Sequence, residues 1–199
     1  KQTIVGNTVF TEEELLPYLR LREGETFSSS AEQESVRGIS ARYGSLGYAD
    51  MSCRPVRHED FENKTVDIVY EITEGRKYFV RQVIITGNTE TKDKVIRGDL
   101  VIHDGDPLDT RRIDVSRQRL LGMGYFENVE ASAVGADALD EKDVVFKVQE
   151  KPTRYNFRIG AGASDISTFF GMAEISTDNF DIMNPGNWFY GGGQRMRIQ

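Results

Sequence analysis

The chain has 199 residues, of which 29% are charged and 38% hydrophobic, a composition that suits one or two folded domains and excludes a disordered chain. Lys and Arg number 25 and Asp and Glu number 32, so the formal net charge is −7. This acidic balance argues against nucleic acid as a partner, because non-specific binding to it needs a positive surface. The single cysteine, Cys53, rules out an intramolecular disulfide and a cysteine-rich metal site.

An internal repeat organises residues 1–151, because four markers recur in the same order. The first copies are Gly6-Asn7-Thr8, Gly24, Leu46-Gly47-Tyr48 and Glu74. The second copies are Gly87-Asn88-Thr89, Gly105, Met123-Gly124-Tyr125 and Glu150. The spacing between copies falls from 81 residues at the asparagines to 76 at the glutamates, as loop insertions would produce.

The first copy begins with a short apolar strand and a glycine-asparagine turn. Thr11 and Glu14 then have the spacing of a capping box, which predicts the start of a helix. Leu15 and Leu19 are four residues apart and share one face of this helix. Pro17 lies inside it, so we expect the helix to be short or kinked.

A second helix is predicted in each copy by apolar residues at helical spacing. In the first copy these residues are Val36, Ile39, Tyr43 and Leu46. At a spacing of 77 they correspond to Ile113, Ser116, Leu120 and Met123. Gly47 and Gly124 follow, and we expect them to end the two helices, as glycine commonly does.

Strands close each copy, because apolar and polar residues alternate over 66–73 and again over 143–148. The predicted order is strand, helix, helix, strand, strand, which gives an α+β domain over 1–76 and another over 77–151. Two helices would cover one face of a three-stranded sheet. Such a sheet has free edges, and an extended partner strand could pair with Tyr48–Arg57 or Tyr125–Val134.

The segment 152–199 differs from the repeats, because helix signals end and glycine and aromatic residues become frequent. Alternation predicts strands over 155–164, 169–178 and 188–199. Strands of about ten residues with one apolar face are typical of a transmembrane β-barrel. A glycine-rich hairpin packed onto the repeats is the alternative. Tyr155, Trp188 and Tyr190 lie near the predicted strand ends, where the aromatic girdle of a barrel would lie.

Taken together, the Gly-Asn-Thr turn, the Leu/Met-Gly-Tyr marker and the closing Glu resemble a POTRA domain. Two such units running into Tyr155-Asn156-Phe157-Arg158-Ile159-Gly160-Ala161-Gly162 resemble the last two POTRA domains and first barrel strands of the outer-membrane protein assembly factor (BamA) family. The resemblance covers nearly the whole chain. It implies two tandem βααββ POTRA domains followed by a truncated antiparallel β-barrel segment. The link over 178–188 is longer than is usual in the family.

The resemblance also implies a function without a cofactor. POTRA domains in the periplasm would receive unfolded outer-membrane proteins and dock accessory lipoproteins, and the barrel would contact outer-membrane lipid. The first helix of the last unit is the implied lipoprotein contact, through Val95, Arg97 and Asp99. The first barrel strand would pair with an incoming strand. Its residues are Tyr155, Phe157, Ile159, Gly160 and Gly162.

Three other functions compete with this reading. An enzyme is disfavoured, because His58 and His103 lack catalytic partners and Gly191-Gly192-Gly193 lacks the lysine and helix of a phosphate loop. The others are a POTRA-bearing secretion transporter or autotransporter assembly factor, and a periplasmic scaffold without a barrel. We also expect the chain to be an excised piece, because strand patterns run to both of its ends.

Overall fold

The computed structural model describes residues 1–135, 139–162 and 169–199. The chain divides into two compact units. One comprises Lys1–Gln82, Asp104–Arg112 and Gly135–Asp143, and the other comprises Val83–His103, Ile113–Val134 and Val144–Gln199. The division does not follow the repeat, because Asp104–Arg112 and Gly135–Asp143 of the second copy belong to the unit that contains the first copy.

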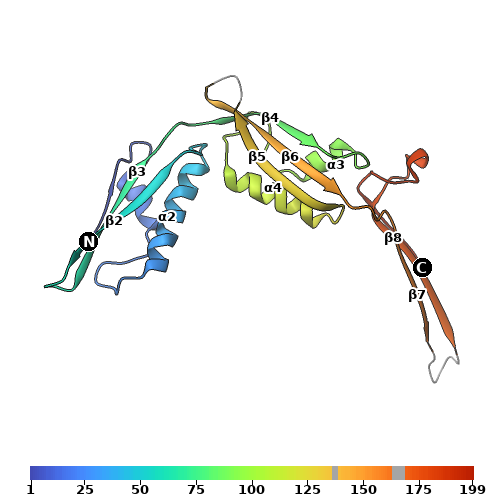
Figure 1. Ribbon diagram of the computed structural model, residues 1–199, viewed down its shortest axis with the longest axis horizontal. Helices are drawn as coiled ribbons and strands as arrows, with labels where there is room; N and C mark the ends of the chain where they lie inside the picture. The colour runs from blue at the N-terminus through green and yellow to red at the C-terminus, as the bar shows by residue number, and fades with distance from the viewer. Residues whose placement is uncertain (136–138, 163–168) are drawn as a thin grey trace. The chain divides into compact units, whose positions relative to one another are not determined.

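The first copy has the predicted element order. Its elements are β1 (Gln2–Val5), α1 (Glu12–Leu15), the 3-10 helix η1 (Leu16–Tyr18), α2 (Ser29–Gly44), β2 (Ser52–Asp60) and β3 (Thr65–Thr73). Strand β1 pairs with β3 in parallel and β2 pairs with it antiparallel, so the sheet order is β1-β3-β2. Helix α2 lies along the β2–β3 hairpin, and the hairpin projects beyond it (Figure 1).

The short helix predicted from Pro17 is confirmed. Thr11 and Glu14 form both hydrogen bonds of a capping box at the start of α1. Helix α1 lasts four residues, and Pro17 then lies in the first turn of η1. The proline has no N–H to donate to a continuing α-helix, so the chain tightens into a 3-10 turn. Leu15 is fully buried beneath this turn.

The core of the first copy lies between α2 and the sheet. Helix α2 contributes Ile39 and Tyr43, and β3 contributes Ile68 and Tyr70, all of them buried. The Tyr43 ring packs edge to face with Phe10, with the ring centroids 4.8 Å apart. This contact joins the loop before α1 to α2. Buried side chains of the helices and of β3 belong to one core, so the helices cover one face of the sheet, as predicted.

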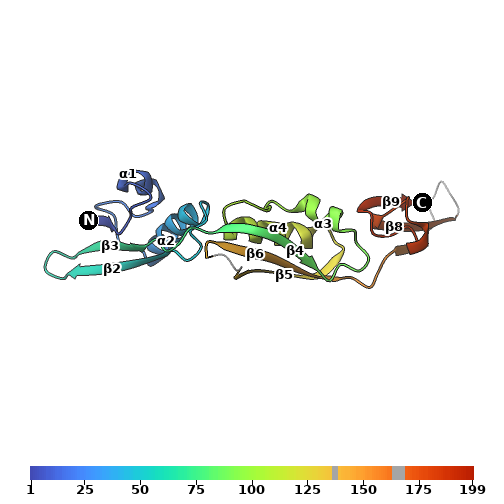
Figure 2. The ribbon, with the colours of Figure 1, turned by 90° about the horizontal axis from the view of Figure 1, so that it is seen from above.

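The second copy repeats the order. Its elements are β4 (Phe79–Thr86), α3 (Asp93–Asp99), α4 (Thr110–Gly122), β5 (Phe126–Gly135) and β6 (Glu141–Glu150). The sheet order is β4-β6-β5, and Figure 2 shows these strands side by side with α4 along them. Helix α4 buries Ile113, Ser116 and Leu120. The closing strand of each copy is therefore again the middle strand of its sheet.

The structure corrects the register of the repeat within the second helix. The backbone N–H of Arg20 donates to the Ser35 hydroxyl at 2.8 Å, and that of Val101 donates to the Ser116 hydroxyl at 3.0 Å. Ser35 and Ser116 are 81 residues apart, so the spacing of 77 predicted for this helix is wrong by four residues. Four residues are about one helical turn, so the shift kept the apolar face intact.

The two glycines predicted to end the second helices differ in outcome. Helix α4 ends at Gly122, and Gly124 follows with φ +82°, where a glycine stops a helix, so that prediction is confirmed. Helix α2 ends at Gly44, three residues before Gly47. Gly47 has φ +99° and accepts a hydrogen bond at its carbonyl from the N–H of Tyr78, at 2.8 Å. A Cβ at position 47 would lie 2.4 Å from the Tyr78 carbonyl oxygen. Gly47 is therefore needed for close contact with the segment that joins the two copies.

The closing glutamate of each copy holds the turn after its first strand. Glu74 accepts backbone hydrogen bonds from Thr8 at 2.6 Å and Val9 at 2.8 Å. Glu150 does the same for Thr89 and Glu90, both at 2.9 Å, and for Thr91. Burial raises the pKa of Glu74, but the hydrogen bonds from the Thr8 hydroxyl, from the N–H groups of Val9 and Thr8 and from the Tyr43 hydroxyl outweigh it and lower the pKa to about 2.

The C-terminal segment forms a third sheet, and its strands differ in part from the prediction. They are β7 (Asn156–Gly162), β8 (Phe170–Phe180) and β9 (Gln194–Ile198), in the antiparallel order β7-β8-β9. Ala163 and Ser164, at the end of the predicted first strand, lie outside the described residues. The third strand begins at Gln194 rather than Trp188, and Tyr190 is buried instead of standing in a girdle.

The register of this sheet separates an apolar face from a polar one. Phe157 pairs with Ile175 and Ile175 with Ile198, so these three side chains share a face. Arg158 pairs with Glu174 on the other face. The predicted alternation is confirmed for β7. It is less clean in β8, because Met172 shares the face of Glu174. Within the described ranges, no helix is long and apolar enough to cross a membrane.

Candidate functional site

The free sheet edges are the first candidate for partner binding. Strands β2 and β5 lie at the ends of their sheets in the described residues, so one row of backbone N–H and C=O groups on each strand is unpaired. Strand β2 contains Pro55, which pairs with Tyr70 across the sheet. Proline is tolerated in such a strand where its missing N–H would face outward, so the outward row of β2 has a gap. Strand β5 contains no proline.

Helix α3 carries the residues predicted to bind a partner. Arg97 donates to the Asp93 carboxylate at 2.6 Å and to the Val83 carbonyl at 3.0 Å. Asp99 is the last residue of the helix and is half-buried. Val95 is half-buried as well. A Cβ added to Gly193 would lie 2.6 Å from a γ-carbon of Val95, so the two residues are in close contact. Val95 therefore belongs to a contact within the chain, whereas Arg97 remains partly exposed.

That contact is a joint between the turn before α3 and the C-terminal sheet. Asn179, at 1% exposure, donates to the Thr91 hydroxyl at 2.8 Å and accepts from the N–H of Gly193 at 2.8 Å. Lys92 forms an ion pair with the buried Asp181. The Lys92 N–H also donates to the Gly191 carbonyl at 2.9 Å. The joint thus combines a buried amide, a buried carboxylate and main-chain hydrogen bonds.

Glu90 adds a second group of contacts to the joint. Its carboxylate accepts from Asn187 at 2.8 Å and pairs with Arg154 at 2.8 Å. The Glu90 carbonyl lies 2.1 Å from where a Cβ on Gly191 would be, and Gly191 has φ +104°. This close approach explains why glycine is needed at position 191. The sequence analysis argued against a phosphate loop at 191–193 but predicted no other role for these glycines.

The sequence missed this joint. Thr91, Lys92, Asn179 and Asp181 are common surface residue types, and nothing in their spacing links positions so far apart in the chain. The one available signal was the run of three glycines after three aromatic residues, which indicates a close approach of backbone to other groups.

The residues of the predicted pairing strand lie at and beside β7. Tyr155 precedes the strand and donates its hydroxyl to the Trp188 carbonyl. Phe157 and Ile159 are exposed on the apolar face, and Gly160 lies opposite Met172. In the described residues β7 pairs with β8 alone, so its other edge is open. Gly162 ends the strand.

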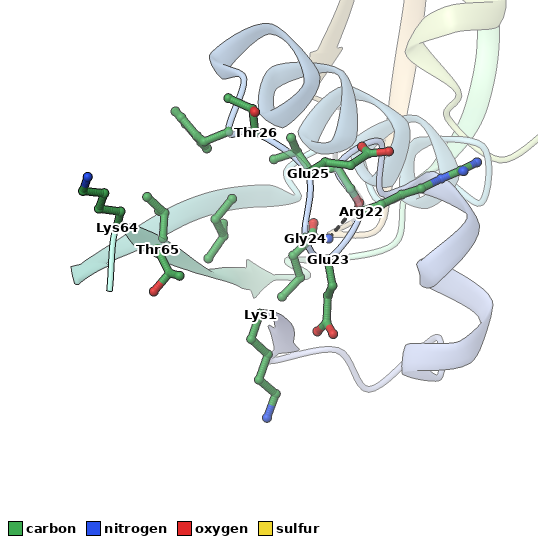
Figure 3. Close-up of a pocket in the computed structure, with 13 residues that line it drawn as sticks. Lys1, Arg22, Glu23, Gly24, Glu25, Thr26, Lys64 and Thr65 are labelled. Atoms are coloured by element: carbon green, nitrogen blue, oxygen red, sulfur yellow. Dashed lines mark hydrogen bonds between the residues drawn. The ribbon is translucent and has the colours of Figure 1, made fainter. Parts of the chain in front are cut away.

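A pocket of about 490 Å³ opens in the first copy (Figure 3). It lies between the start of β1, the loop Leu21–Phe27 and the start of β3. Its labelled side chains carry both signs of charge, with Lys1, Arg22 and Lys64 beside Glu23 and Glu25. The mixed lining favours neither an anionic nor a cationic ligand.

Among the described residues, no group of three or more His, Cys, Asp or Glu side chains could hold a metal ion. Cys53 is half-buried in β2, and burial raises the pKa of its thiol to about 11. A protonated thiol is a poor nucleophile.

Comparison with known proteins agrees with this architecture. The POTRA family, described as "Surface antigen variable number repeat", matches residues 1–75 and 78–151. The chain is similar to the outer membrane protein assembly factor BamA of Neisseria meningitidis, with 33% identity over 90% of this chain and 23% of that protein. BamA of Neorickettsia risticii is 30% identical over 81% of this chain and 21% of its own length.

Solved structures show the same likeness. BamA from Haemophilus ducreyi lacking POTRA domains 1–3 superimposes with a TM-score of 0.84 at 25% identity, covering 98% of this chain and 35% of that one. POTRA domains 3–5 of Haemophilus influenzae BamA give a TM-score of 0.66 at 32% identity, over 75% of this chain and 59% of that one.

Each repeat has its helices on one face of its sheet and a first turn held by its closing glutamate. The two repeats are POTRA domains, and the chain belongs to the POTRA family. Within it, the identity to outer membrane protein assembly factors and the superposition on solved BamA place the chain in the BamA family. The chain spans less than a quarter of the length of these two curated relatives.

Proposed function

We propose that the parent protein folds and inserts outer-membrane proteins, with the two POTRA domains as its receiving arm in the periplasm. In this proposal residues 1–76 and 77–151 are the POTRA domains, and residues 152–199 are the first strands of a barrel in the outer membrane. The observation that carries it is the superposition on Haemophilus ducreyi BamA, which extends over 98% of the chain and so includes the third sheet. The apolar and polar faces of that sheet support a barrel wall.

Depletion of the parent protein tests the proposal. The levels of other outer-membrane barrels should fall, because their insertion depends on the factor, while periplasmic soluble proteins should remain constant. Quantitative proteomics of membrane fractions is the measurement. Unchanged barrel levels together with a secretion defect for one substrate would favour a POTRA-bearing transporter instead. If the full-length protein showed no membrane partitioning and no heat-modifiable mobility, a scaffold without a barrel would be favoured.

Unfolded outer-membrane proteins are the partners that the β5 edge suits best. The edge offers main-chain groups that pair with any extended strand regardless of its side chains. Because β2 has a gap at Pro55, β5 should be the stronger acceptor. Adding an extended barrel-strand peptide should slow amide hydrogen exchange in Phe126–Gly135 more than in Ser52–Asp60. Equal or stronger protection of β2 would contradict this assignment.

Accessory lipoproteins are the partners proposed for the exposed side of α3. Charge reversal by Arg97→Glu or Asp99→Lys should lower recovery of a lipoprotein in a pull-down with full-length protein several-fold. Arg111→Glu, on an exposed position of α4, is the matched control and should leave recovery unchanged. Because Arg97 also holds Asp93 and the Val83 carbonyl, circular dichroism should confirm that each variant is folded. Unaltered recovery with both reversals would remove α3 from the proposal.

Strand β7 is the proposed pairing strand, and an incoming client would pair with its open edge. Gly160 and Gly162 present little side chain along it, so the strand can bend and release a partner at low cost. A cysteine at Phe157 or Ile159 should cross-link to a client barrel strand in the membrane, and a cysteine at Phe61, which is 82% exposed in the first POTRA domain, should not. Equal cross-linking at all three positions would refute a specific pairing strand.

A further inference from the structure

The charges of the third sheet alternate in sign from strand to strand. In the two outer strands every charged residue is an arginine, namely Arg158 in β7 and Arg195 and Arg197 in β9. In the middle strand β8 both charged residues are acidic, namely Glu174 and Asp178. Within these three strands, each charged side chain is therefore next to a strand of the opposite sign.

Glu174 is the centre of this arrangement. Its side chain is 5% exposed and lies between arginines of both neighbouring strands. A guanidinium nitrogen of Arg158 lies 3.5 Å from the Glu174 carboxylate, and one of Arg197 lies 3.6 Å from it. Gln199 also donates to this carboxylate at 3.0 Å. Two cations share one anion here, so the group keeps a positive charge.

Arg158 carries this positive charge at the open edge of the sheet. In the described residues β7 pairs with β8 alone, so its second edge can accept a further strand. The Arg158 side chain is 66% exposed, and a single one of its nitrogens donates to Glu174. A guanidinium has five N–H donors in a planar fork, which binds a carboxylate through two parallel hydrogen bonds. Arg158 therefore keeps donors for a second carboxylate.

The residues beside Arg158 in β7 leave its charge uncovered. On the polar face of the strand it lies between Asn156 and Gly160, and no other residue from Asn156 to Gly162 is charged. Gly160 has no side chain that could cover the guanidinium. A paired strand would therefore meet one charge at one position of this face. Residues directly opposite each other in paired strands are close enough for opposite charges to stabilise the pair.

We propose that Arg158 selects incoming strands that carry an acidic residue directly opposite it, on their polar face. Such a strand continues the alternation of the sheet, with acidic and arginine side chains on successive strands. The inference rests on the proposed function, in which a client pairs with the open edge of β7, and it adds the chemistry of that client. The partner is an unfolded outer-membrane protein with aspartate or glutamate on the polar face of a barrel strand.

Cross-linking to synthetic strands tests this selection. The full-length parent protein carries Phe157→Cys as its single cysteine, so Cys53→Ser is included. The probes are peptides of about ten residues with alternating valine and threonine, the length of a barrel strand. A central cysteine replaces one valine and is flanked by two glutamates, two glutamines or two lysines. Since both flanking residues lie on the polar face, one of them lies opposite Arg158 whichever way the peptide runs.

The yield of disulfide between peptide and protein is the measurement. At low salt the glutamate peptide should give about two- to fivefold more disulfide than the glutamine peptide, as one opposite-charge pair across strands predicts. The lysine peptide should give the least. About 1 M salt should reduce these differences, because it screens exposed charges. Equal yields from the three peptides would refute the selection and leave β7 as the pairing strand. No disulfide with any peptide would refute both.

Single substitutions assign the preference to Arg158. Arg158→Gln should make the glutamate and glutamine yields equal, whereas Arg158→Lys keeps the charge and should retain a preference for glutamate. Arg195→Gln is the matched control, because Arg195 is an 81% exposed arginine on the same face but in β9, away from the open edge of β7. It should keep the wild-type preference. If Arg195→Gln removed the preference as fully as Arg158→Gln, general charge attraction would explain it and the proposal would fail.

Reversal of the charge is the sharpest test. Arg158→Glu/Glu174→Gln places a carboxylate at the open edge without setting two carboxylates opposite each other, so the lysine peptide should now exceed the glutamate peptide. The yield with the glutamine peptide shows whether β7 still pairs, and it should stay near the wild-type value in every variant. A collapse of all three yields in both Arg158→Gln and this double variant would mean that Arg158 holds β7 in the sheet, and would overturn the proposal.

Discussion

At the scale of single residues, each POTRA domain depends on one carboxylate. Glu74 accepts hydrogen bonds from the turn that follows β1, and it also accepts from the Tyr43 hydroxyl at 2.8 Å. Burial raises the pKa of Tyr43, and its hydrogen bond to Glu74 raises it further, so the phenol stays protonated and donates. One side chain therefore joins the closing strand, the first turn and helix α2.

Replacement of that carboxylate should expose its contribution. Glu74→Gln removes the charge that strengthens several hydrogen bonds, so we expect a loss of roughly 1–3 kcal/mol in the free energy of unfolding at pH 7. Urea titration of the wild type and the variant is the measurement. Glu71→Gln, on an exposed position of β3, is the control and should change stability little. Equal losses in both variants would mean that the charge at position 74 has no special role.

Acid should remove the same contribution. The pKa of Glu74 is about 2 in the fold and near its ordinary 4.5 in the unfolded chain. Because the folded pKa is depressed, the stabilisation is complete above pH 4.5 and is lost as the pH falls toward 2. The stability of the wild type should thus decline more steeply than that of Glu74→Gln between these values. Parallel pH profiles of the two proteins would contradict the low pKa.

At the scale of elements, the hydrophobic periods predicted the order and type of the POTRA elements well. The helices were predictable because their apolar faces recur every three or four residues, and the capping box of Thr11 marked a start. The residue spacing between the second helices of the two copies was not predictable, because a shift of one helical turn leaves an apolar face unchanged. Only a contact outside the helix, from Arg20 to Ser35 and from Val101 to Ser116, reveals the spacing of 81.

Those serine contacts should stabilise both domains. Ser35 and Ser116 are fully buried, and each hydroxyl satisfies a backbone N–H from the loop before the helix. Ser35→Ala and Ser116→Ala should each cost about 1–3 kcal/mol, because the N–H is left without its acceptor. Ser29→Ala, at the exposed start of α2, is the control. Thermal unfolding measures the effect, and wild-type midpoints in both buried variants would show that other groups satisfy the N–H.

At the scale of the whole chain, the joint between the second POTRA domain and the third sheet was beyond sequence reasoning. Its residues are far apart along the chain and carry no periodic signal, so only the folded backbone brings Asn179 to Thr91 and Asp181 to Lys92. The start of the third strand was predicted too early in the chain for the same reason. The alternation from Trp188 onward is typical of a strand, but Gly191 and Gly193 lie in close contact with Glu90 and Val95, and β9 begins only at Gln194.

The joint can be loosened selectively. Asn179→Ala should remove hydrogen bonds to Thr91 and Gly193, so amide exchange in Asp181–Gly193 should accelerate roughly tenfold or more. Exchange in the first POTRA domain should remain unchanged. Asn128→Ala, on the exposed face of β5, is the control. Uniform acceleration throughout the chain would show that Asn179 supports global stability rather than the joint.

The parallel pairing of β1 with β3 has a mechanical consequence. These are the first and last strands of the first POTRA domain, and they run in the same direction side by side. Tension applied at the two ends of the domain therefore loads their hydrogen bonds in shear, so many must break together instead of one at a time. Forced unfolding depends on that barrier rather than on equilibrium stability. The domain can thus transmit a pull along the chain as a stiff link.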